Sequence, residues 1–142
     1  MDNFAVSSGF RLGASMKNKT LLMFWSSLEL PAGIALIAAP SRVAKLLISA
    51  GLTPGGEAVG RLGGCALFSL AIACWPRADG DHTQPIRALF LYNIMAACYL
   101  GYLKIGGEFS SFLLLPACGL HGLLALLFIR PVYESAVGKG SI

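Results

Sequence analysis

Charged residues are scarce in this 142-residue chain, where Asp, Glu, Lys and Arg together make up 13%. A soluble domain normally carries about 25% charged residues. Hydrophobic residues instead reach 56%, and the mean hydropathy is +0.70. So few charged residues could not cover a surface that is exposed to water. The composition therefore excludes a soluble globular protein and indicates that the protein is surrounded by lipid. The length allows one compact domain over residues 1–142.

The motifs of common catalytic and cofactor sites are also missing. The sequence has no HExxH, no P-loop and no GxSxG. The four cysteines form no C-x-x-C pair, and each lies in an apolar stretch, where a free Cys behaves as a small hydrophobe: Cys65, Cys74, Cys98 and Cys118. No second intramembrane His accompanies His121 for bis-His haem ligation. We therefore expect no cofactor and no metal, and we favour a protein that is not an enzyme.

Long apolar runs are what the chain has in abundance. Each approaches the ~20 residues that an α-helix needs to cross a bilayer, and together they cover residues 21–39, 58–75, 86–103 and 112–129. Backbone polar groups in lipid must be satisfied internally, which favours helices. We predict an all-α fold, a four-transmembrane-helix bundle forming a single membrane domain. We expect no cleaved signal peptide, because the first run follows a long basic leader and contains Glu29 and Pro31.

The connection between the first two runs has the pattern of a short amphipathic helix. Its apolar positions recur at i, i+3, i+4 and i+7: Val43, Leu46, Leu47 and Ala50. Arg42 and Lys45 occupy another face. This pattern is typical of a helix that lies on the membrane surface. We expect Ser41 to be its N-cap and Gly51 to stop it.

Basic residues predict the orientation of the four spans. The side that holds the N-terminus, the second connection and the C-terminus carries seven: Arg11, Lys17, Lys19, Arg77, Arg87, Arg130 and Lys139. The other side carries three: Arg42, Lys45 and Lys104. The positive-inside rule puts both termini in the cytoplasm, and Trp25 and Trp75 then suit interfacial anchors. The net charge of +4 is explained by orientation and lipid headgroups, so we expect no nucleic-acid partner.

Three polar residues interrupt the apolar runs near mid-depth: Glu29 in the first, Asn93 in the third and His121 in the fourth. An ionisable group there costs of order 3 kcal/mol on insertion scales, so such residues usually face the bundle interior and find partners. One interpretation is a structural network in which Glu29 bonds to His121 or Asn93. The other is proton handling or ligand binding at the midplane.

The second run holds two further features. Gly60 and Gly64 form a GxxxG pattern, which lets helices approach closely, either within this chain or between copies of it. Arg61 lies about one turn inside the non-cytoplasmic end. It can snorkel to the interface, pair with a carboxylate or bind an anion. Glu57, four residues earlier, is a suitable partner.

The segments GRLGGCALFSLAIACW, FLYNIMAACYL and LPACGLHGLLALL resemble a group of small uncharacterised four-helix proteins of bacterial inner membranes. The architecture, though not the motifs, is also similar to DoxX-like proteins. The likeness covers about residues 20–130 and implies the membrane but no ligand or activity. We therefore expect an accessory, assembly or interaction protein with a membrane partner or a homo-oligomeric state. A proton-linked carrier or channel using Glu29 and His121 is the alternative, and a membrane redox protein is the second alternative.

Overall fold

The computed structural model describes residues 3–77, 80–107, 109 and 111–137, with side chains from residue 16 onward. Five helices make up this part: α1 (Asn3–Ala38), α2 (Pro40–Ile48), α3 (Pro54–Ala73), α4 (Thr83–Ile105) and α5 (Leu114–Val137). The described residues contain no strand, so the predicted all-α fold is confirmed.

Four helices are long and apolar enough to cross a membrane. The candidate spans are Met16–Ala38, Pro54–Ala73, Thr83–Ile105 and Leu114–Val137. Their length and composition indicate a multi-pass membrane protein. The helix ends differ from the predicted ones, because helices continue where the apolar runs stop. The largest extension is in α1, which begins at Asn3 instead of near residue 21. The helix α5 runs through Pro131 to Val137 instead of ending near residue 129.

The short helix α2 exists, but its caps are not the predicted ones. Ala39 is the N-cap residue and Pro40 follows it, because the fixed φ of Pro suits a first helical position. Ser41 is therefore inside the helix, and its hydroxyl donates to Glu57 Oε1 of α3 at 2.6 Å. Ser49 ends α2 in the left-handed conformation with φ 57°, two residues before the predicted stop at Gly51.

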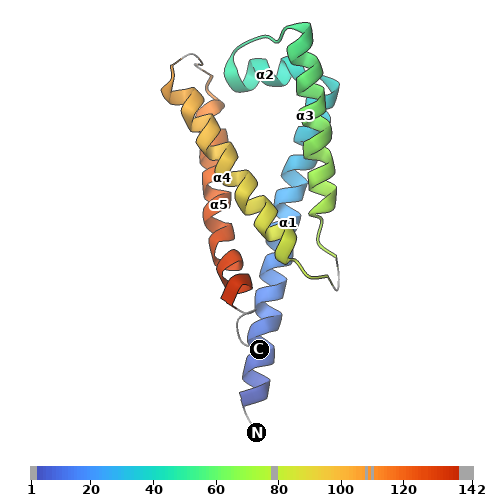
Figure 1. The fold of residues 1–142 in the computed structure, drawn as a ribbon, viewed down its shortest axis with the longest axis vertical. Coiled ribbons are helices and arrows are strands. Elements are labelled where there is room, and N and C mark those ends of the chain that lie inside the picture. The colour runs from blue at the N-terminus through green and yellow to red at the C-terminus, as the bar shows by residue number, and fades with distance from the viewer. Residues whose placement is uncertain (1–2, 78–79, 108, 110, 138–142) are drawn as a thin grey trace.

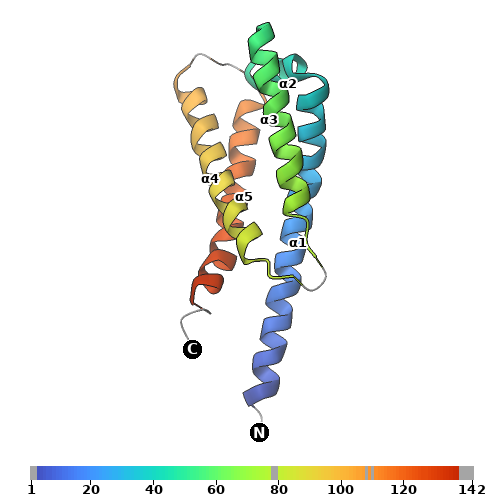
Figure 2. The same ribbon diagram turned by 45° about the vertical axis from the view of Figure 1, so that its right-hand side comes forward.

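The long helices are arranged in two antiparallel pairs, α1 with α3 and α4 with α5 (Figures 1 and 2). In the first pair, Gly33 of α1 meets Gly64 of α3 with no side chain between them. A Cβ added at Gly64 would lie 2.8 Å from both the Gly33 carbonyl oxygen and the Ile37 amide nitrogen. Small residues at such crossings allow close backbone packing. Gly60 packs against Pro40, so both glycines of the GxxxG pattern face the interior of this chain.

The two pairs join through a hydrophobic core nearer the end that carries the termini (Figure 1). This core consists of Leu22, Trp25, Ala71, Cys74, Ile86, Leu89, Leu124 and Phe128. Trp25 is fully buried in it. The prediction that Trp25 is an interfacial anchor is therefore wrong, because its ring packs between helices. Trp75, just beyond α3, is 45% exposed.

At the opposite end, α2 crosses from one helix pair to the other (Figure 1). Its beginning is held to α3 by the Ser41–Glu57 hydrogen bond. Its end is held to the connection between α4 and α5, because the Ser111 hydroxyl donates to the Leu46 carbonyl. The molecule is thus closed by the core towards one end and bridged by α2 at the other.

Candidate functional site

A large cavity lies between the two helix pairs, on the α2 side of the core. Its volume is about 910 Å³. Ligand sites in proteins are typically ≈ 300–1,000 Å³, so this space has the size of a small-molecule site. All five helices contribute to its walls.

Most of the wall is aliphatic. The apolar faces of the long helices and of α2 supply it: Ala32, Ala35, Leu36, Val43, Leu46, Leu47, Gly63, Ala66, Leu67, Leu70, Ala96, Leu100, Leu113 and Ala117. Three apolar residues of the predicted amphipathic helix are thus in this wall. The helix α2 thus turns part of its apolar face towards the cavity.

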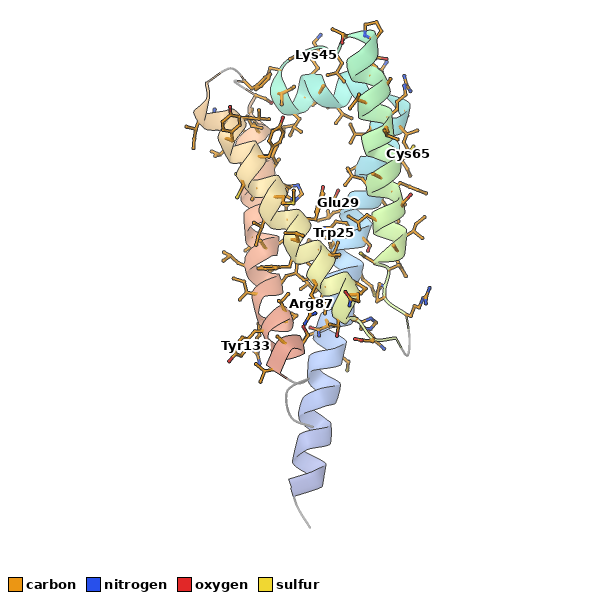
Figure 3. The ribbon with its side chains drawn as sticks, viewed as in Figure 1. Trp25, Glu29, Lys45, Cys65, Arg87 and Tyr133 are labelled. Carbon is orange, nitrogen blue, oxygen red and sulfur yellow. The ribbon has the colours of Figure 1, made fainter. Side chains whose placement is uncertain are left out.

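Polar groups enter the cavity from three helices. We call Glu29 of α1, Tyr92 of α4 and His121 of α5 the polar floor, and Tyr99 also lines the wall. Figure 3 shows Glu29 one turn beyond Trp25 on α1, where this helix faces α4. The polar floor therefore borders the hydrophobic core, whereas the aliphatic wall extends from it towards α2.

His121 is oriented by a part-buried hydrogen bond. Its Nδ1 lies 2.9 Å from Asn93 Oδ1, and the Asn93 Nδ2 donates to the Leu89 carbonyl at 2.7 Å. Since the amide nitrogen is used as a donor, the Asn93 oxygen must accept a proton from His121 Nδ1. In the neutral ring, the other nitrogen Nε2 then carries a lone pair. The structure therefore brings Asn93 and His121 together and leaves His121 with a free acceptor.

Glu29 is near this pair but does not bond to it. Its side chain is buried, and no hydrogen bond or ion pair joins it to any other described residue. The interpretation from the sequence had Glu29 bonded to His121 or Asn93, whereas the structure pairs Asn93 with His121 and leaves Glu29 out of this pair. An ionised carboxyl group without a counter-charge is expensive in an apolar site. A ligand that supplies a hydrogen bond or a positive charge would consequently stabilise Glu29 more than the other residues of the polar floor.

Aromatic ring contacts that involve Tyr92 and His121 of the polar floor connect the two helix pairs. The Tyr92 ring meets the Trp25 ring edge-on with centroids 5.7 Å apart, and meets the His121 ring in the same way at 5.6 Å. Such edge-to-face contacts are favourable. The Trp25 Nε1 and the Ser26 Oγ are buried without a hydrogen-bond partner in the described part of the chain. This aromatic contact, rather than a polar bond, is what joins α1 to α4 beside Glu29.

Arg61 lies outside this site. Its Nη1 donates to the Ile37 carbonyl at 2.6 Å, and its Nη2 is 3.5 Å from Glu57 Oε2. The carbonyls of the last turn of a helix lack intrahelical partners, so Arg61 satisfies one near the end of α1. Of the alternatives drawn from the sequence, Arg61 thus makes the carboxylate contact, with a backbone carbonyl as its shorter bond.

The cysteines contribute no site of their own. All four thiols are free, and Cys118 donates to the Ala97 carbonyl at 3.3 Å. Within the residues for which side chains are described, no group of three or more His, Cys, Asp or Glu side chains could hold a metal ion.

Tyr92 lines the cavity, whereas its sequence position left open whether it faces the bundle interior or a membrane interface. It precedes Asn93 directly, and the position of a Tyr within an apolar run does not separate an interface from the interior. Sequence reasoning missed the aliphatic wall, since its alanines and leucines have no distinguishing sequence pattern. Comparisons with protein-family models, with curated proteins and with solved structures gave no match.

Proposed function

We propose that this protein is a non-enzymatic protein of the bacterial inner membrane that binds an amphiphilic molecule from the bilayer. On this proposal both termini are cytoplasmic, α2 lies at the opposite membrane surface, and the ligand occupies the cavity between the helix pairs. The observation that carries the proposal is a 910 Å³ space whose wall is aliphatic and whose polar groups gather on one floor.

The distribution of polarity favours a ligand with one polar head. An aliphatic wall accommodates an apolar body that comes from the bilayer and holds it by van der Waals packing, because lipid tails are as apolar as the wall itself. The polar floor offers hydrogen-bonding groups at Glu29, Tyr92 and His121. A head on the floor with its body directed towards α2 satisfies both parts of the site.

Filling the cavity tests this proposal. Ala96 lines the cavity, whereas Ala88 is exposed on the same helix. We expect the unmodified protein, extracted in mild detergent, to carry a bound amphiphile that native mass spectrometry detects. Ala96→Trp should remove it, and Ala88→Trp should not. Thermal unfolding of both variants reports whether they remain folded. Equal loading of the two variants, or no bound molecule in any preparation, would contradict the proposal.

A proton-linked carrier is the second candidate, favoured by an acid that lies in the cavity without a hydrogen bond. Its expected signature is flux across reconstituted vesicles that Glu29→Gln abolishes. Flux unchanged by this substitution would exclude Glu29 as the coupling group.

An accessory or assembly role remains our proposal for what ligand binding serves. Because Gly60 and Gly64 face Pro40 and α1 in this chain, a membrane partner or a second copy would use another face. Crosslinking in native membranes that finds only isolated monomers would contradict this role.

A further inference from the structure

The polar floor offers more free hydrogen-bond acceptors than hydrogen-bond donors. His121 offers the Nε2 lone pair, since its Nδ1 is committed to Asn93. Glu29 offers carboxyl oxygens, and no described residue donates to them. The one amide donor nearby, Asn93 Nδ2, is used by the Leu89 carbonyl. A ligand head that supplies several N–H donors would complement this floor.

The charge of the lining points the same way. Among its residues Glu29 is the one acid, and neither Lys nor Arg lines the described cavity. A bound cation would supply the counter-charge that an ionised Glu29 lacks. The rings of Tyr92 and Tyr99 add electron-rich faces, which attract ammonium groups.

We propose that the head of the ligand is a protonated amine, so that the cavity binds an alkylammonium amphiphile. This inference rests on the proposed function and specifies its ligand class. The ammonium group donates to the Glu29 carboxylate and to His121 Nε2, and the alkyl chain lies along the aliphatic wall towards α2.

Two other head groups fit less well. A carboxylate or phosphate would meet the Glu29 carboxyl and find no Lys or Arg in the described lining. A hydroxyl has one proton to donate and brings no charge. The ammonium head is therefore distinguished from both by charge and by the number of its donors.

Matched amphiphiles with one tail test the inference. The protein is placed in phosphatidylcholine nanodiscs, and binding of radiolabelled dodecylammonium is measured by scintillation proximity against protein-free discs. Dodecanol, dodecanoate and dodecyltrimethylammonium serve as competitors. We expect dodecylammonium to bind at least tenfold more tightly than dodecanol or dodecanoate. Dodecyltrimethylammonium should fall between, because it has the charge without the N–H donors.

Substitution of Glu29 tests whether this residue causes the preference for dodecylammonium. Removing a hydrogen bond to a charged group lowers affinity on the order of 10- to 100-fold. We expect Glu29→Gln to weaken dodecylammonium by this factor and to leave dodecanol unchanged. Glu134→Gln is the matched control, because Glu134 pairs with Arg130 on α5 and neither residue lines the cavity. If Glu29→Gln does not fold, the competition series on the unmodified protein decides the question.

The outcomes separate the two proposals. Dodecanol or dodecanoate binding as tightly as dodecylammonium would overturn the amine assignment and leave the cavity proposal standing. Absence of dodecylammonium binding, or a preference for it that survives Glu29→Gln, would also overturn the assignment. Failure of the proposed function would appear instead as extracted protein without any bound amphiphile.

Discussion

At the residue scale, the pairing of Asn93 with His121 is the most informative contact. Asn93 is fully buried on α4 and uses its oxygen and its nitrogen at once. A buried amide with both groups satisfied avoids the penalty of an unpaired polar atom. The contact therefore joins α4 to α5 and fixes the ring of His121 where it lines the cavity.

A double-mutant cycle measures this contact. We expect Asn93→Leu and His121→Phe each to destabilise the bundle, with a coupling of about 0.6 kcal/mol and at most about 1.7, as found between membrane helices. Unfolding free energies from denaturant titration in micelles give the four corners of the cycle. Strictly additive effects would show that the hydrogen bond contributes no stability.

Residue identity alone predicted the buried polar positions better than the aromatic ones. Glu29, Asn93 and His121 stand out in apolar runs because each is costly in lipid. Trp25 gives no such signal, because Trp suits both an interface and a helix contact. Whether Glu29 reaches a partner depends on the separation of helices, which no single residue encodes.

At the element scale, the crossing of α1 and α3 depends on missing side chains. Gly33 and Gly64 place backbone against backbone. A substituent at either position would separate these helices, and the close pair forms one wall of the cavity.

Adjacent glycines on α3 provide a matched test of this crossing. Gly64→Ala would bring a Cβ within 2.8 Å of backbone atoms of α1, whereas a Cβ at Gly63 meets nothing within 4 Å. We expect Gly64→Ala to cost about 1–3 kcal/mol, as overpacking does, and Gly63→Ala to be near neutral. Thermal unfolding in detergent compares the two. Similar melting temperatures for both variants would show that the crossing relaxes without cost.

The sequence predicted which elements exist better than where they end. Four apolar runs are a strong signal for four spans, and α2 followed from its periodicity. Helix ends are set by local backbone bonding, so α5 continues beyond the apolar run and past Pro131. At α2, Pro40 took the first helical position and moved Ser41 inside the helix.

At the scale of the whole molecule, both described ends of the chain lie at the end of the bundle opposite α2 (Figure 2). This arrangement follows from four spans in sequence. The excess of Lys and Arg on that side predicts that it faces the cytoplasm.

Reporter fusions test this orientation. A fluorescent protein at the C-terminus should be fluorescent, and alkaline phosphatase there should be inactive, because the phosphatase requires the oxidising periplasm for its disulfides. Alkaline phosphatase fused after Gly107, beyond α4, should be active. The reverse pattern would place the basic side outside and contradict the assignment.

The cavity itself was beyond sequence reasoning. Each wall residue is an ordinary lipid-compatible side chain, and the space arises from how the two pairs diverge above their common core. Divergence depends on side-chain packing at Trp25, Tyr92 and Phe128, and thus on contacts between elements far apart in the sequence.

The double anchoring of α2 has a geometric consequence. Nine residues at 1.5 Å each make a strut of roughly 14 Å, with one hydroxyl bond towards each helix pair. The length of α2 therefore sets the distance between the two helix pairs at this end of the cavity. A homologous chain with one extra turn in α2 would hold its two helix pairs about 5 Å further apart. Its cavity would accept a bulkier ligand, although the polar floor would be unchanged.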